Sequence, residues 1–227
     1  MKKLNQLVLV VLLLIAGASS PLAQSLSNAI VVDENVLVSG DAPARPHVEP
    51  CVAADPADAQ HLIAASIAFT RPDAWFTVAV FTSFDGGRSW RRSKPQGLEA
   101  FGFVGDAWTA FGSKGVAYLC CVASSKDNAL VLVFHSTDGG RSWSKRTIVP
   151  FGRGGPFDRC SIVADTSASK FAGYVYVLAS QSLGSKTGHS LSPVVVSRST
   201  DARVRRFFDA IPLARIVEPE NHRTLEP

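Results

Sequence analysis

Four acidic residues occur at corresponding places in successive stretches of the chain, and they are the first candidates for chemistry. They are Glu49, Asp106, Asp158 and Glu218, each at the opening of a similar β-type stretch. Clustered carboxylates could supply a general acid, hold a cation or accept hydrogen bonds from sugar hydroxyls. Alternatively, each acid could accept backbone hydrogen bonds from the neighbouring unit and fix the units together. We favour the structural interpretation, because a residue repeated in every unit usually serves the unit, whereas a catalytic residue generally occurs once.

Arg159 departs from this repetition and is the strongest single candidate for ligand binding. In the alignment of the openings it takes the place of Pro50 and Ala107, next to Asp158. A guanidinium can bind a carboxylate through two parallel hydrogen bonds, so Arg159 could bind an acidic sugar, or it could pair with Asp158 and join two units. Loops expected on the same side supply further substrate-binding candidates, which are Arg71, Trp75, Arg153 and His189. The 5 histidines are scattered without ligand spacing, so we expect no metal and no cofactor.

An eight-residue motif occurs twice and identifies the elements that would position these side chains. Ser83-Phe84-Asp85-Gly86-Gly87-Arg88-Ser89-Trp90 recurs as Ser136-Thr137-Asp138-Gly139-Gly140-Arg141-Ser142-Trp143, and a worn third copy begins at Ser199 with Phe207 near the tryptophan position. Ser and Asp side chains bond the backbone of their own turn, and glycine allows positive φ. Each good copy follows a β-type run, so the motif predicts a hairpin turn. Its structural residues are Ser83, Asp85, Gly87, Trp90, Ser136, Asp138, Gly140 and Trp143.

These turns resemble the Asp-box, or bacterial neuraminidase repeat, whose pattern is Ser-x-Asp-x-Gly-x-x-Trp. Both good copies match the pattern at every fixed position. The resemblance implies an all-β, sialidase-like β-propeller built of four-stranded antiparallel blades, with six blades in a full ring. Sialidases, other glycosidases and several non-enzymatic proteins share this turn, so it implies the fold better than the activity.

The chain divides into a leader, a lead-in segment and a series of blades. Residues 1–23 are basic and then apolar, which is typical of a signal peptide, and residues 24–46 are expected to hold a lead-in strand, Ala29 to Val38, and a linker. The predicted propeller covers 47–227, with blades at about 47–98, 104–151 and 156–212 and the start of a fourth at 213–227. Three blades of six would leave two apolar blade faces open. We therefore favour a truncated product, and self-association is the alternative.

The resemblance implies a secreted or periplasmic, sialidase-like glycosidase, which we expect to be a truncated or inactive form. Sialidases use three arginines, a Tyr–Glu nucleophile pair and an aspartic acid/base, with the first arginine in an Arg-Ile-Pro motif that this sequence lacks. The tyrosines Tyr118, Tyr174 and Tyr176 all fall in strand patterns. A non-catalytic extracellular propeller that binds a carbohydrate or a protein is one alternative. A scaffold or assembly factor is the other.

The charge balance and the cysteine content limit which partners and which disulfides we expect. The chain has 23 Lys and Arg against 19 Asp and Glu, so we expect no nucleic acid partner, and no membrane contact once the leader is removed. Basic residues that follow the motif copies are interpreted as charges guarding edge strands. Of the four cysteines, Cys51 and Cys160 are predicted at one shared blade position. A bridge from either to Cys120 or Cys121 is therefore favoured over a direct one, and four free thiols are the alternative.

Overall fold

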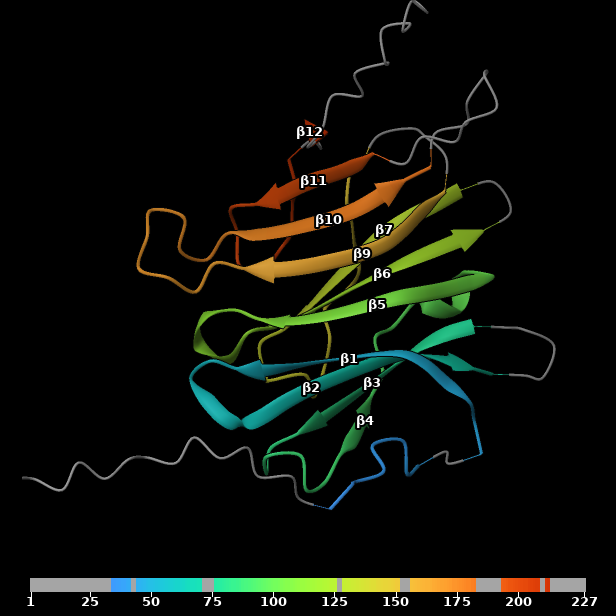
Figure 1. Ribbon diagram of the computed structural model, residues 1–227. Coiled ribbons are helices and arrows are strands. Elements are labelled where there is room, and N and C mark those ends of the chain that lie inside the picture. The colour runs from blue at the N-terminus through green and yellow to red at the C-terminus, as the bar shows by residue number, and fades with distance from the viewer. Residues whose placement is uncertain are drawn as a thin grey trace, which may run out of the picture. The chain divides into compact units, whose positions relative to one another are not determined.

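The computed structural model describes residues 34–41, 44–70, 76–125, 128–151, 156–182, 193–208 and 211–212. All of these except Glu34 and Asn35 belong to one compact unit, Val36–Pro227. They form three four-stranded antiparallel sheets (Figure 1). Among the described residues, no helix is long and apolar enough to span a membrane.

In each sheet the strands lie side by side in the order in which the chain forms them. The first sheet contains β1 (His47–Asp55), β2 (Asp58–Phe69), β3 (Phe76–Ser83) and β4 (Arg91–Ser93). The second contains β5 (Phe103–Phe111), β6 (Ala117–Ser125), β7 (Asn128–Ser136) and β8 (Thr147–Ile148). The third contains β9 (Phe157–Ala164), β10 (Val175–Gln181), β11 (Val194–Ser199) and β12 (Ile211–Pro212). Such a meander is the blade of a propeller, so the predicted fold class, a partial propeller of four-stranded antiparallel blades, is confirmed.

The core lies between neighbouring sheets, and β6 is buried on both of its faces. Side chains alternate along a strand, so Tyr118, Cys120 and Val122 pack toward the third sheet. Leu119 and Cys121 point the other way and pack toward the first sheet. The adjacent cysteines therefore face opposite sides of the strand. The first strands of the three sheets, β1, β5 and β9, are also neighbours in space.

The two predicted turns close through local hydrogen bonds. In the first, the Ser83 hydroxyl accepts the Gly87 N–H at 2.9 Å and donates to Asp85 Oδ1 at 2.8 Å. The Asp85 carboxylate also accepts the Ser89 N–H at 2.9 Å and the Ser89 hydroxyl at 2.5 Å. The second turn repeats every one of these bonds with Ser136, Asp138, Gly140 and Ser142. The sequence of the motif is therefore sufficient to close its own turn.

The tryptophans of the two turns have different partners. Trp90 Nε1 donates to Gly87 O at 2.9 Å within its own turn. Trp143 Nε1 donates to Ser93 Oγ at 2.9 Å, on the edge strand of the preceding sheet. In the degenerate third copy, the Asp201 carboxylate instead accepts a hydrogen bond from Arg205 Nε at 2.7 Å, and Phe207 is buried. Only the second tryptophan joins two blades.

One sequence-based expectation about the start of the chain is wrong where it can be compared. The lead-in strand was expected to reach Val38, but residues 34–41 form coil and turn. No strand of the described sheets includes these residues. The rest of that segment and the predicted start of a fourth blade lie outside the described residues.

The turn aspartates should make the fold sensitive to acid. Hydrogen bonds from Ser89 and then Ser83 lower the pKa of Asp85 to about 2. Partial burial opposes the shift at Asp138, yet bonds from Ser136 and Ser142 still lower its pKa to about 2. A carboxyl group with a depressed folded-state pKa stabilises the fold above its ordinary pKa of about 4 and loses that contribution as pH falls toward about 2.

We expect the double variant Asp85→Asn/Asp138→Asn to be less stable at pH 6 and to lose less stability between pH 4 and pH 2 than the unchanged protein. Urea unfolding at several pH values measures both, and parallel curves would contradict the expectation.

Candidate functional site

Each first strand carries a bulge at the same place. The pairing skips two residues between Val48 and Cys51 in β1, and between Gly105 and Trp108 in β5. In β9 the pairing skips from Asp158 to Ser161. The first skipped residue of each strand has left-handed backbone torsion: φ is 51° at Glu49, 50° at Asp106 and 51° at Arg159. Left-handed backbone is costly for residues other than glycine, so these are three equivalent strained positions.

The bulges correct the sequence alignment of the third opening by one residue. Arg159, and not Asp158, is the structural counterpart of Glu49 and Asp106. By the same register Ser161, and not Cys160, corresponds to Cys51 and Trp108. The sequence alignment of the blade openings paired one acid with another. In the structure, the shared feature is the left-handed bulge position, which is occupied by a basic residue in the third blade. The repeated position therefore carries two acids and one arginine in the described blades.

Asp106 lies at the centre of this group. Its Oδ2 accepts the backbone N–H of Arg159 at 2.9 Å, which joins the second blade to the third. Partial burial raises the pKa of Asp106, and its hydrogen bond with Asp158 and the negative charges of Asp158 and Glu49 act in the same direction. Arg159 Nε lies 3.9 Å from Asp158 Oδ2, and both side chains are exposed. The site thus combines a partly buried carboxyl group, whose pKa is raised, with an exposed guanidinium.

The bulges enclose a shallow cavity of about 270 Å³. Its wall includes Trp108, whose side chain is 48% exposed. Trp108 was not selected from the sequence, although a tryptophan two residues after a repeated acid was a usable signal. The other lining residues are Glu49, Pro50, Cys51, Asp106, Ala107, Arg159, Cys160 and Ser161. An exposed indole beside carboxylates and a guanidinium combines an apolar face with hydrogen-bonding groups of both charges.

The four cysteines are free thiols, which is the alternative that the sequence left open. The Cys51 thiol donates to Ala107 O at 3.3 Å, and the Cys160 thiol donates to Asp106 O at 3.0 Å. Both contacts run from one blade to its neighbour and support the bulges from behind. Burial raises the pKa of Cys160 well above its ordinary value, and the same holds for Cys121. These thiols are therefore poor nucleophiles and serve as packing groups.

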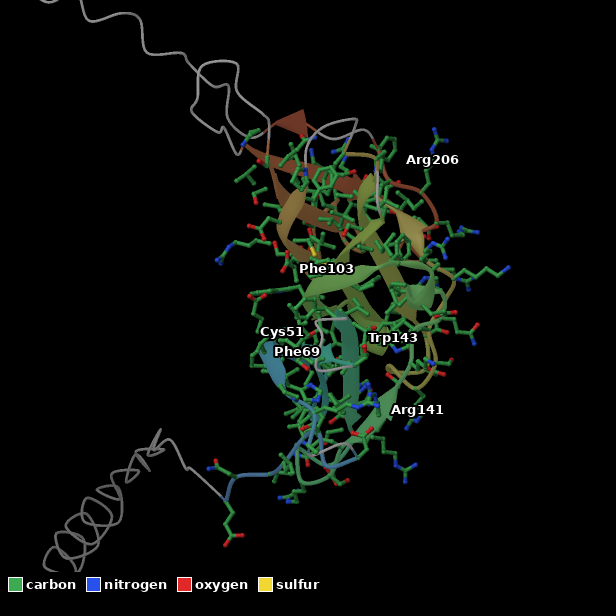
Figure 2. All side chains as sticks on the ribbon, turned by 90° about the vertical axis from the view of Figure 1, so that its right-hand side faces the viewer. Cys51, Phe69, Phe103, Arg141, Trp143 and Arg206 are labelled. Carbon is green, nitrogen blue, oxygen red and sulfur yellow. The ribbon has the colours of Figure 1, made fainter. Side chains whose placement is uncertain are left out.

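The structure brings together Glu49, Asp106, Asp158 and Arg159, and it places the turn residues elsewhere. In Figure 2, Cys51 of the bulge cavity and Arg141 of the second turn lie toward opposite sides of the view. Four predicted binding residues, Arg71, Trp75, Arg153 and His189, lie outside the described residues, as does Glu218. Within the described ranges, no three His, Cys, Asp or Glu side chains are grouped to hold a metal ion.

Comparison with known proteins supports the fold. No protein-family model matches the chain, and no curated protein matches its sequence. A protein of unknown function from Dyadobacter fermentans is similar at 19% identity and TM-score 0.53, over 73% of this chain and 50% of that one. An alpha-L-arabinanase from Penicillium chrysogenum, complexed with arabinobiose, follows at 15% identity and TM-score 0.49, over 74% of this chain and 50% of that one. The alpha-L-arabinofuranosidase arb93a from Fusarium graminearum gives 15% identity and TM-score 0.48, over 73% and 48%. The chain thus spans about half the length of these structures, and likeness at this identity concerns the fold alone.

Proposed function

We propose that this chain is a glycosidase-related, sialidase-like propeller that binds an acidic carbohydrate in the bulge cavity. The observation that carries the proposal is the use of charged side chains at strained positions. Glu49 and Arg159 occupy left-handed backbone where glycine would be favoured by roughly 1 to 2 kcal/mol. Strain of this kind gathers at binding sites, where the side chain is needed for more than the fold.

The cavity offers three complementary contacts to a sugar. Arg159 is exposed and suits a sugar carboxylate, which it can bind through two parallel hydrogen bonds. Trp108 presents an apolar face on which a pyranose ring can stack. Asp106 offers carboxylate oxygens that can accept hydrogen bonds from sugar hydroxyls, and partial burial raises its pKa.

We expect binding without turnover from this chain alone. A sialidase needs a tyrosine nucleophile, and Tyr118 is unsuited to that role. Its hydroxyl donates to Ala202 O at 2.7 Å, and burial raises the pKa of Tyr118 to about 12. Tyr174 and Tyr176 belong to the second strand of the third blade or its entrance, where both are half-buried. Any hydrolysis belongs to a larger ring, of which this chain would supply one part.

Isothermal titration with sialyllactose, neutral lactose and arabino-oligosaccharides tests the proposal. Trp108→Ala should weaken binding of the preferred sugar at least 10-fold, because a stacked ring contributes more than about 1.4 kcal/mol. Arg159→Gly should remove the preference for a carboxylated sugar and, by relieving strain, raise the free energy of unfolding by about 1 kcal/mol. Val163→Ala removes an exposed apolar side chain from the same strand as Arg159 and serves as the matched control.

Two results would contradict the proposal. The first is folded protein that binds none of these sugars, and the second is binding that survives Trp108→Ala and Arg159→Gly unchanged. A protein partner captured by the chain in a manner insensitive to both variants would favour the scaffold alternative. Release of nitrophenol from an aryl sialoside, lost in Asp106→Asn, would show that the chain is active by itself.

We also propose that the chain acts outside the cytoplasm after removal of residues 1–23. The support is the basic and apolar character of those residues. Mass spectrometry of the N-terminus of protein recovered from the producing cells tests this, with Gln24 expected as the first residue. Self-association through open blade faces stays a prediction, which the molar mass from light scattering can check.

A further inference from the structure

A second cavity lies between the first and second turns, away from the bulges. This turn groove has a volume of about 490 Å³ and is lined among others by Phe84, Asp85, Ser89, Arg91, Arg92 and Arg141. Its walls come from two blades, because Arg91 and Arg92 belong to β4 whereas Arg141 belongs to the second turn. Residues of two neighbouring blades therefore form the groove together.

Arg141 is held in place before any ligand arrives. Its guanidinium lies over the ring of Phe84 at 3.7 Å from the centroid, and its Nη1 donates to Asp138 O at 2.8 Å. Phe84 also stacks on His61, with ring centroids 4.6 Å apart and an interplanar angle of 17°. A guanidinium has five N–H donors, so the stack fixes Arg141 while leaving donors for an anion.

The positive charge of the groove is only partly neutralised. Asp85 is its one acidic lining residue, and Ser83 and Ser89 already donate to that carboxylate. Arg92 Nη1 lies 3.2 Å from Asp41 Oδ2 at the surface, where an exposed ion pair contributes little. Arg91 is exposed, and no ion pair within the described residues involves it. Three arginines and one aspartate thus line the groove.

We propose that the turn groove binds an acidic polysaccharide through its sulfate or carboxylate groups. Guanidiniums recognise such oxyanions through paired hydrogen bonds, and preorganised donors lose little entropy on binding. The groove has room for more than one anionic group, which favours a chain over a free ion. This site is independent of the bulge cavity, so either proposal can fail without the other.

Isothermal titration calorimetry with a sulfated heparin hexasaccharide at 50 mM salt tests the proposal. The variant Arg91→Gln/Arg141→Gln should weaken binding at least 10-fold and reduce its salt dependence, because two charge contacts are lost. The matched control Arg203→Gln/Arg206→Gln removes two exposed arginines from the third turn and should leave the affinity unchanged. Arg91→Gln alone leaves the Arg141 stack intact, so its effect is expected even if the double variant folds poorly.

Several results would overturn the proposal. Equal losses in the two double variants would mean diffuse attraction to the basic surface. Equal affinity for inorganic sulfate would mean an ion site, and equal affinity for oligothymidylate would mean a nucleic acid surface. Sialyllactose binding at the bulge cavity should be unaffected by Arg91→Gln, which separates this site from the one proposed above.

Discussion

Replacing Gly139 with alanine should lower the free energy of unfolding by about 4 kcal/mol. Gly139 has φ 73°, and an added Cβ would lie 2.6 Å from Cε1 and 2.8 Å from Nε2 of His61. His61 cannot move aside, because its ring is packed against both Phe84 and Phe111 at 4.6 Å. We sum about 1 to 2 kcal/mol for left-handed backbone and about 1 to 3 kcal/mol for overpacking. Guanidinium chloride unfolding measures the change.

Gly86→Ala is the matched control, because Gly86 is the equivalent residue of the first turn. Its φ is 72°, and the nearest atom to an added Cβ is Gln60 Oε1 at 2.9 Å. Gln60 is exposed and its end can swing away, so only the backbone cost of about 1 to 2 kcal/mol should appear. Equal losses in the two variants would show that the contact between blades contributes nothing beyond backbone strain.

Replacing His61 with phenylalanine should cost about 3 kcal/mol of unfolding free energy, although the ring stays aromatic. His61 Nε2 donates to Gly139 O at 2.8 Å, since a carbonyl can only accept, and Nδ1 lies 3.2 Å from Asp55 Oδ2. Asp55 is buried, so the variant leaves its carboxylate with the Ala57 N–H at 2.9 Å and without the imidazole. Breaking a buried hydrogen-bonded pair by removing one partner costs several kcal/mol.

Asp55→Asn should cost only about 1 kcal/mol. The amide oxygen can keep the bond from Ala57, and the amide N–H can donate to the neutral imidazole at Nδ1, so every partner stays satisfied. The double variant Asp55→Asn/His61→Phe completes a cycle that isolates the pair. A His61→Phe loss below 1 kcal/mol would mean that the buried hydrogen bonds of His61 do not stabilise the fold. Full additivity in the cycle would mean that Asp55 and His61 do not stabilise each other.

The fold class was predictable because its signals are local. The β-type runs before each turn predict strands, and the Ser, Asp and Gly of each turn bond to atoms within four residues of themselves. Adjacent Cys120 and Cys121 lie on opposite faces of β6 because strand side chains alternate, which follows from their adjacency in the sequence. Such statements need no knowledge of the neighbouring blade.

The candidate site was predictable in part. Glu49, Asp106, Asp158 and Arg159 were selected from the repeat, and they do meet at the bulges. The alignment of the third blade was wrong by one residue. A bulge adds a residue to the strand and shifts the register, and the residue types in the sequence do not reveal it. Trp108 was not selected as a binding residue, because only the cavity shows that its indole is exposed.

By itself, the sequence determined that this is an all-β repeat protein with two self-closing turns. Only the tertiary structure decided what each repeat does for its neighbour. Gly139 is a variable position of the motif, yet it receives the ring of His61, 78 residues earlier in the chain. Trp90 and Trp143 occupy the same motif position, yet only Trp143 reaches another blade. The physical reason is that a turn is specified by bonds within its own few residues, whereas contacts between blades depend on how whole sheets pack.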